Sequence, residues 1–300
     1  MPKTHATSAR RRGFAAAFIA AVIAVTGATV LGSAESAAAV TGPTATPTAS
    51  STGVPAGTKL KVHNGDLTIR TAGTVVDGLD IRGFVRVEAA NVTIKNSIVR
   101  GRQTTGNAIM IYAGAGKNQN LKVRNVEIAP SYPTPLTNGI YGFDFTLDRV
   151  NIHDVIDSVH VFGDNVTIAN SYLHDNLHYT NDPHHRDGSH DDSIQVQKGN
   201  NIVITNNHIS GSYNAALMVT QDQGRVSNVR LSNNWIGDGG CTVNVAEKGK
   251  GAIQGLKVTD NIFGGSRFGC SMLIPPTTPV YDKGNVKADS SVVRVDRRQQ

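Results

Sequence analysis

The sequence predicts an all-β solenoid, because one short pattern rich in β-branched residues recurs seven times. Periods of about 20 to 50 residues are typical of repeat architectures. In each copy the apolar residues are spaced by two, as at Val92 and Ile94, which is the periodicity of a strand rather than a helix. Successive copies start 29, 24, 21, 36, 27 and 27 residues apart. The seven copies are VTIKNSIV from Val92, LKVRNVEI from Leu121, FTLDRVNI from Phe145, VTIANSYL from Val166, IVITNNHI from Ile202, VRLSNNWI from Val229 and LKVTDNIF from Leu256.

The fifth position of this pattern is Asn in five copies, Arg149 in one and Asp260 in the last. Buried amides need hydrogen-bond partners, and a column of identical side chains supplies them coil after coil. Asn-containing hairpin turns of a β-sandwich are the alternative, but sandwich strands do not repeat one side-chain template at this period. We therefore expect a stack of amides at the fifth position.

A second strand accompanies each copy, and the two strands together resemble the coil of the right-handed parallel β-helix in the pectate-lyase-like superfamily. Residues 75–285 carry this resemblance. It implies that the second strand forms the first sheet of each coil, that V-T-I-K forms the second sheet, that the Asn fills the tight bend, and that S-I-V forms the third. The second strands are NAIMIY from Asn107, NGIYGF from Asn138, DSVHVF from Asp157, DSIQVQ from Asp192, NAALMV from Asn214, CTVNVA from Cys241 and CSMLIP from Cys270.

The strand from His190 to Gln195 adds a narrower resemblance. Its His-x-Asp-x-x-Gln order is similar to that of secreted, actinobacterial-type β-helix proteins. The N-A-A-L strand from Asn214 and the G-G-x-T-V strand from Gly239 belong to the same resemblance. This resemblance supports the fold of a secreted β-helix protein more than it supports a particular reaction.

Composition divides the chain into four parts. Residues 1–39 predict an export signal of the Sec or twin-arginine type, with a basic front, an apolar centre and a small-residue cleavage site. Residues 40–57, rich in Thr, Pro and Ser, predict a flexible linker, residues 58–290 one β-helix domain, and residues 291–300 a frayed tail. A permanent membrane anchor is the alternative to the signal, but no stop-transfer flank follows the apolar centre. We expect a secreted, monomeric protein without membrane contact after cleavage.

The charge balance argues against nucleic acid as a partner. The formal net charge is +6, and the first 39 residues contribute four basic residues and one acidic residue to it, which leaves the rest of the chain near +3. That excess is too small to indicate nucleic-acid binding or long-range steering of an anionic polymer. An extracellular or cell-wall polysaccharide is the expected partner.

The two cysteines, Cys241 and Cys270, occupy the same position in consecutive coils. Neighbouring strands lie about 4.8 Å apart, a separation that a disulfide tolerates. Disulfides persist in exported proteins. We expect a disulfide here, and a stacked pair of free thiols is the alternative.

The outward face of the first sheet is the expected substrate groove. Alternate residues of a strand point outward, and aromatic rings next to polar groups suit a sugar polymer. In the superfamily this face binds the substrate, which implies binding roles for Gln195, Gln197, Phe162, Phe143 and Asn244. The first expected column is Met110, Tyr141, His160, Gln195, Leu217, Asn244 and Leu273. The second is Tyr112, Phe143, Phe162, Gln197, Val219 and Ala246.

The longest interval between copies holds a loop crowded with His and Asp. Five of the ten histidines lie in residues 174–192, which enter the first sheet beside Gln195. Loops held on a rigid scaffold are where function is usually found. A solvated loop whose Asp and His residues cap turns is the alternative.

The leading hypothesis for this loop is a polysaccharide lyase that cleaves a uronate-containing glycan by β-elimination. The reaction needs a positive charge on the uronate carboxylate, a base and an acid. Arg186 or Lys198 would neutralise the carboxylate. His190 or His160 would be the base, and Tyr141 would assist as the acid.

Three acidic residues leave further alternatives open. Ca²⁺ held by Asp187 and Asp191 would neutralise the carboxylate in place of a basic side chain. The pair Asp191 and Asp192 resembles the paired-Asp strand of polygalacturonases, so a glycoside hydrolase is the second hypothesis. The Asn-Thr-Asp, Gly-His-Gly and Arg-Ile-Lys signatures of that family are absent from the sequence. A polysaccharide-binding β-helix without catalysis is the third hypothesis.

Overall fold

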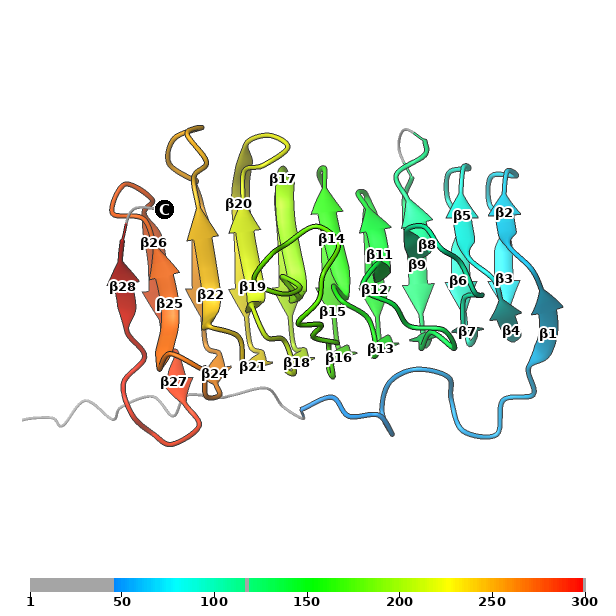
Figure 1. Ribbon diagram of the computed structural model, residues 1–300, viewed down its shortest axis with the longest axis horizontal. Helices are drawn as coiled ribbons and strands as arrows, with labels where there is room; N and C mark the ends of the chain where they lie inside the picture. The colour runs from blue at the N-terminus through cyan, green and yellow to red at the C-terminus, as the bar shows by residue number, and fades with distance from the viewer. Residues whose placement is uncertain (1–45, 117–118, 299–300) are drawn as a thin grey trace, which may run out of the picture. The chain divides into compact units, whose positions relative to one another are not determined.

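The protein is a right-handed parallel β-helix. The computed structural model describes residues 46–116 and 119–298, and every regular element in these ranges is a β-strand. The strands stack in parallel in three ladders, each with one strand per coil (Figure 1). The predicted fold class is therefore confirmed. No helix within these ranges is long and apolar enough to cross a bilayer. The predicted signal at residues 1–39 lies outside the described residues.

The three ladders follow the order that the sequence pattern predicts, because the second strand of the pattern forms the first ladder. The first ladder contains β2 (Leu67–Ile69), β5 (Val85–Val87), β8 (Ala108–Ala113), β11 (Thr137–Gly142), β14 (Val159–Phe162), the start of β17 (Asp192–Thr205), β19 (Ala215–Thr220), β22 (Cys241–Ala246), β25 (Cys270–Ile274) and β28 (Val295–Arg297). The second ladder contains β3 (Val75–Asp77), β6 (Thr93–Lys95), β9 (Leu121–Arg124), β12 (Phe145–Asp148), β15 (Val166–Ala169), the end of β17, β20 (Val226–Ser232), β23 (Leu256–Thr259) and β26 (Val280–Lys283). The third ladder contains β1 (Lys61–Asn64), β4 (Leu79–Arg82), β7 (Ile98–Val99), β10 (Glu127–Ile128), β13 (Asn151–Ile152), β16 (Tyr172–Leu173), β18 (His208–Ile209), β21 (Trp235–Ile236), β24 (Ile262–Phe263) and β27 (Val286–Lys287).

Aliphatic columns fill the interior of the coils. Ile140, Val159, Ile194 and Leu217 lie in register on successive strands of the first ladder, and none has exposed surface. Burying one such side chain contributes about 1.5 to 3 kcal/mol to folding. The columns give the outward face of the same strands a rigid support.

The fifth position of the pattern forms the tight bend between the second and third ladders. All seven residues there have a left-handed backbone, with φ between 48° and 57°. Asn and Asp tolerate this conformation better than other residues that carry a Cβ atom. The expected amide stack is present in two pairs, since Asn125 Nδ2 donates to Asn96 Oδ1 at 3.1 Å and Asn206 Nδ2 to Asn170 Oδ1 at 2.6 Å.

The fully buried amide ladder lies one residue later than expected. Asn207 Nδ2 donates to Asn234 Oδ1, and Asn234 Nδ2 donates to Asn261 Oδ1, each at 3.0 Å. The backbone N–H groups of Asn207 and Asn234 donate to the same two oxygens. Asn285 extends the ladder by one coil. These bonds satisfy polar groups that no water reaches, because Asn207, Asn234 and Asn261 have no exposed surface.

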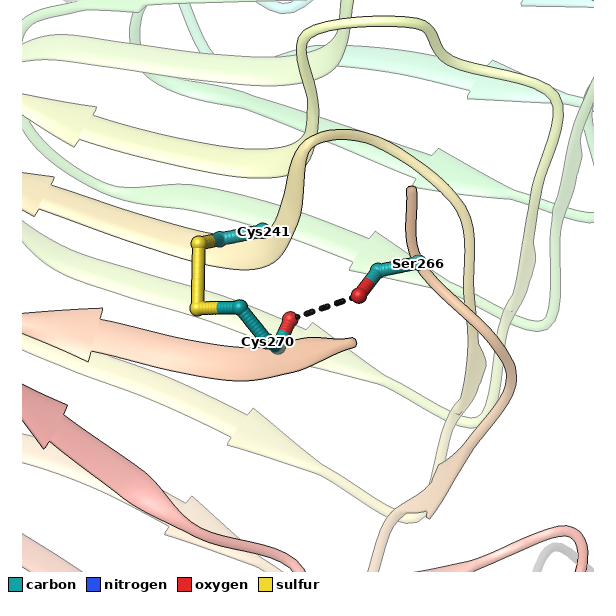
Figure 2. Close-up of a disulfide and its surroundings, with 3 residues drawn as sticks. All are labelled: Cys241, Ser266 and Cys270. Atoms are coloured by element: carbon teal, nitrogen blue, oxygen red, sulfur yellow. Dashed lines mark hydrogen bonds between the residues drawn. A yellow bond between two sulfur atoms is a disulfide. The ribbon is translucent and has the colours of Figure 1, made fainter. Parts of the chain in front are cut away.

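The predicted disulfide is confirmed. Cys241 on β22 and Cys270 on β25 pair in register with their Cα atoms 4.7 Å apart, close to the predicted strand spacing (Figure 2). Ser266 Oγ donates to the carbonyl oxygen of Cys270 at 2.9 Å and holds the turn that leads into β25. The bond therefore joins two consecutive coils of the first ladder.

The described part of the predicted linker lies on the domain. The N–H of Gly53 donates to the carbonyl of Arg149 at 2.9 Å, and His208 Nδ1 lies 3.2 Å from the carbonyl oxygen of Pro47. Pro47 and Thr52 are buried. Residues 46–57 thus contact the third ladder rather than standing free of it.

The C-terminal segment differs from the expected frayed tail. Val295–Arg297 form β28, which pairs with Met272, Leu273 and Ile274 of β25. Arg297 Nη1 donates to the carbonyl of Thr278 at 2.7 Å. The segment therefore adds the last strand of the first ladder, next to β25.

Candidate functional site

The outward column of the first ladder is the floor of the candidate site. Its members lie in register on successive strands: Tyr112, Tyr141, His160, Gln195, Met218, Asn244 and Leu273. The predicted first column is confirmed at five of these positions. It is wrong at Met110 and Leu217, which have no exposed surface, and Tyr112 and Met218 take their places. The offset is one residue at Met218 and two residues at Tyr112. A shift of one residue exchanges an outward position for a buried one.

The predicted second column is partly wrong. Val219 and Ala246 are buried, and Tyr112 belongs to the first column. Phe143, Phe162 and Gln197 remain partly exposed. The rings of Phe162 and Phe143 meet edge to face with centroids 6.0 Å apart. A β-bulge after Val161 pairs Phe162 with Lys198 rather than with Gln197, which the sequence did not reveal.

A pocket of about 510 Å³ lies over this column, between the first ladder and the loop 174–191. Tyr141, His160 and Gln195 contribute from the floor, and Gln197 lines it as well. The loop contributes Asp182, His184, His185 and His190. Lys248, in the turn after β22, lines the pocket as well. The pocket therefore joins the two features that the sequence singled out, the polar part of the groove and the His-rich loop.

Three side chains, Asp157, His160 and Tyr141, lie together in this pocket. His160 Nε2 is hydrogen-bonded to Asp157 Oδ2, and the hydroxyl of Tyr141 lies 3.4 Å from the same nitrogen. The Tyr141 and His160 rings stack with centroids 4.0 Å apart and planes 9° from parallel. Because Asp157 accepts at Nε2, that nitrogen carries the hydrogen and Nδ1 keeps a lone pair. Asp157 thus fixes the tautomer and orientation of His160, as the carboxylate does in a catalytic triad.

Tyr141 keeps its proton over the ordinary pH range. Burial and the negative charge of Asp157 raise the pKa of the Tyr141 phenol strongly. A protonated phenol beside an oriented imidazole provides a hydrogen-bond donor and a proton acceptor side by side. General acid–base chemistry needs this pair of groups.

Asp192 lies at the first residue of β17, with no exposed surface. Its backbone N–H donates to Asp157 Oδ1 at 2.6 Å, and its Oδ1 accepts from Asn214 Nδ2 at 2.8 Å. Its Oδ2 is buried and has no hydrogen-bond partner among the described residues. Burial, followed by the charge of Asp157, raises the pKa of Asp192 well above its usual range. A neutral carboxyl group at this place avoids an uncompensated buried charge.

The two carboxylates predicted to hold Ca²⁺ differ in exposure and in hydrogen-bond partners. Asp191 has no exposed surface, and its oxygens are bonded to the Tyr213 N–H at 2.6 Å, to His178 Nδ1 at 2.8 Å and to Ser189 Oγ at 3.1 Å. Asp187 is exposed and pairs with His190 at 3.1 Å. Within residues 46–116 and 119–298 no group of three or more His, Cys, Asp or Glu side chains is arranged to bind a metal ion.

The remaining predicted site residues do not all line the pocket around His160. His190 lines the pocket and stacks on His185 with ring centroids 4.0 Å apart, on the loop side. Arg186 lines a separate hollow formed by residues 180–186. Lys198 lines another one together with Phe143 and Phe162. Asn244 follows Met218 on the column, one coil further along.

Sequence reasoning missed three residues of the site, Asp157, Asn214 and Lys248. Asp157 and Asp192 both open a strand that reads Asp-Ser-x-x-Val, and this repeated pair was the available signal. Asn214 lies at the equivalent start of the next strand. Lys248 follows β22 in a turn, where the sequence carries no motif.

The raised pKa of Asp192 predicts that Asp192→Asn increases stability near neutral pH. The wild-type carboxyl contributes stability that is fully present below the unfolded pKa, near 3.8, and is lost as the pH rises through the raised folded pKa. The amide is neutral at every pH and keeps an oxygen for Asn214. Thermal unfolding measured from about pH 4 to neutral pH should show a gain that grows with pH. Asp187→Asn, at an exposed position, is the matched control, and a gain independent of pH would contradict this account.

No family model and no curated protein matches the sequence. Among solved structures, the chain is similar to the Dettilon tailspike protein at 12% identity and a TM-score of 0.33, over 78% of this chain. The match spans 61% of the tailspike chain. A TM-score of this size carries no argument about the site, so the assignment of the fold rests on the strand pairing described above.

Proposed function

We propose that this protein is an exported enzyme of the pectate-lyase-like superfamily that cleaves an extracellular, uronate-containing polysaccharide by β-elimination. The observation that carries the proposal is the group Asp157, His160 and Tyr141, in which Asp157 holds the His160 ring and Tyr141 stacks on it, in a pocket on the outward face of a β-helix. An oriented base and a protonated phenol are the two groups that elimination needs from the protein.

In the proposed step His160 Nδ1 takes the proton from the carbon next to the uronate carboxylate. The electron pair of that bond forms a double bond to the neighbouring carbon, and the glycosidic bond on that carbon breaks. The leaving oxygen takes the proton of Tyr141. The imidazolium of His160 then releases the proton on Nδ1 to solvent, and the Tyr141 oxygen takes a proton from solvent. Both groups return to their starting forms, and no water is consumed.

The positive charge for the uronate carboxylate would come from Lys248. Its ammonium group lies 3.7 Å from Asp222, is about half exposed, and lines the pocket. Arg186 and Lys198, the predicted neutralising residues, line other hollows. Lys248 is therefore the basic side chain that we assign to this role.

Glycoside hydrolysis is the second candidate, because two carboxyl groups with different environments lie together in the pocket. The raised pKa of Asp192 favours its neutral form, so Asp192 would be the acid in this reaction. Asp157, which accepts hydrogen bonds on both oxygens, would be the second carboxyl group. In this reaction the two carboxyl groups would be Asp157 and Asp192, whereas the sequence predicted Asp191 and Asp192. We rank this reaction second because Asp192 has no exposed surface through which to reach a glycan, whereas His160 and Tyr141 keep some.

The test is a panel of pectate, alginate, glucuronan and glycosaminoglycans, each incubated with the mature protein with and without Ca²⁺ or a chelator. Elimination leaves a double bond that absorbs in the ultraviolet and a new reducing end. Hydrolysis leaves reducing ends alone. If neither signal arises while the protein is retained on a polysaccharide, the enzyme proposal fails and a non-catalytic binding β-helix stands in its place.

A further inference from the structure

We propose that Arg82, Arg100, Arg102 and Tyr132 form a second subsite, which binds a carboxylate-bearing sugar of the same glycan chain at a distance from the cleaved bond. These residues line a hollow of about 450 Å³ that is separate from the pocket around His160. The inference rests on the proposed function, since it takes the substrate to be a polyuronate.

The three guanidinium groups keep hydrogen-bond donors free for a ligand. Arg100 Nε donates to Asp80 Oδ1 at 2.7 Å, and Arg82 Nε lies 3.4 Å from the other oxygen of the same carboxylate. A guanidinium group has five N–H donors. In the described part of the chain, both terminal nitrogens of Arg100 are without a protein acceptor. They are therefore available to an anion.

Arg102 is held in place from two sides. Its Nε and Nη2 donate to the two oxygens of Asp66 at 2.9 and 2.7 Å, and its guanidinium lies 5.1 Å from the centre of the Phe84 ring. Asp66 and Asp80 thus each accept from these guanidinium groups, and the carboxylate of Glu127 also lies near enough to attract Arg100. Side-chain exposure of 39% to 56% makes all three accessible to a ligand.

Tyr132 gives the hollow an apolar surface. Its side chain is among the large hydrophobic groups that remain exposed, at 55%. A phenol ring next to guanidinium groups offers one face for a sugar ring and charged donors for its carboxylate. Planar guanidinium groups bind carboxylates through paired hydrogen bonds, which a lone ammonium group does not offer.

The hollow lies on the same edge of the β-helix as the catalytic pocket. Arg82 and Arg100 end or follow β4 and β7, and Tyr132 follows β10, all on the third ladder. The loop 174–191 leaves β16 of that ladder, two strands beyond β10. Two strand spacings correspond to about 10 Å along the coils. A polymer lying along this edge would pass from the arginines to His160, so we infer a substrate of several acidic sugars rather than a single one.

Binding is tested in the His160→Ala background, so that the ligand is not consumed. The probes are hexamers and dimers of pectate and of alginate, with carboxyl-reduced hexamers as neutral counterparts. Arg102→Ala and Arg100→Lys should each weaken binding of the acidic hexamer that the protein takes by about tenfold, the loss expected for charge-assisted hydrogen bonds. Arg100→Lys keeps a charge for Asp80 and guards against misfolding. Arg124→Ala, an exposed arginine paired with Asp148 on the second ladder, is the matched control.

The outcomes separate this inference from the proposed function. Unchanged hexamer binding in both arginine variants, equal losses in Arg124→Ala, or losses that extend to the dimers and the neutral hexamers would each overturn the subsite. If cleavage by the otherwise wild-type protein depends on His160 while the arginine variants bind normally, the function stands and the subsite falls. If the arginines control binding but no glycan is cleaved, the subsite stands and the lyase falls.

Discussion

Replacement of His160 by Ala is expected to lower the rate of glycan cleavage by about a hundredfold to ten-thousandfold, the usual contribution of a positioned general base. The imidazole is held by Asp157 and stacked on Tyr141, so its loss removes the proton acceptor and leaves both partners in place. The measurement is the initial rate of ultraviolet-absorbing product on the glycan that the wild type cleaves. Thermal unfolding of the variant checks that the fold is intact.

His190→Ala is the matched control for this experiment. Its ring is about half exposed, pairs with Asp187 on the loop and lines the same pocket. We expect the loss of His190 to change the rate by less than about tenfold. Its partner Asp187 is exposed, whereas Asp157, the partner of His160, also accepts from the backbone N–H of Asp192 on β17. If His190→Ala abolishes cleavage and His160→Ala retains it, the base is His190 on the loop rather than His160.

The second large effect concerns stability, where Asn234→Ala should lower the free energy of unfolding by about 2 to 5 kcal/mol. The substitution leaves the N–H of Asn207 and the carbonyl of Ile204 without their partners in the interior. It also ends the amide ladder between Asn207 and Asn261. Each buried group left unpaired costs about 1 to 3 kcal/mol. Chemical denaturation measures the difference.

The neighbouring residue provides the control. Asn233 has a φ of 56°, and glycine adopts this conformation without strain. We expect Asn233→Gly to change the free energy of unfolding by less than about 1 kcal/mol. Equal losses at both positions would mean that the bend, rather than the buried ladder, carries the stability.

The fold was predictable because its coils repeat a side-chain template. Alternating aliphatic residues assign each strand to the interior, and the Asn of the bend marks where the second ladder ends. The position of the buried ladder was missed because Asn206 and Asn207 are adjacent and identical in type. Only backbone conformation separates them, since Asn206 takes the left-handed bend and Asn207 has no exposed surface.

The site was predictable in part. Tyr141, His160 and Gln195 were predicted to lie on the outward column because they alternate with aliphatic core residues, and this alternation is visible in the sequence. Asp157 was missed because its role depends on the bend of the chain just before β14, which brings its carboxylate back to His160 three residues later. Lys248 was missed because no periodic pattern governs the turn that carries it.

The measurement that tests the central claim most directly is product mass after cleavage in water labelled with heavy oxygen. Elimination forms its products without water, so their masses should add up to that of the substrate and carry no label. Hydrolysis adds one water for each bond broken, and the new reducing end then carries the heavy oxygen. Unlabelled, unsaturated products that disappear in His160→Ala are the predicted result, and labelled, saturated products would contradict the lyase and favour the pair Asp157 and Asp192.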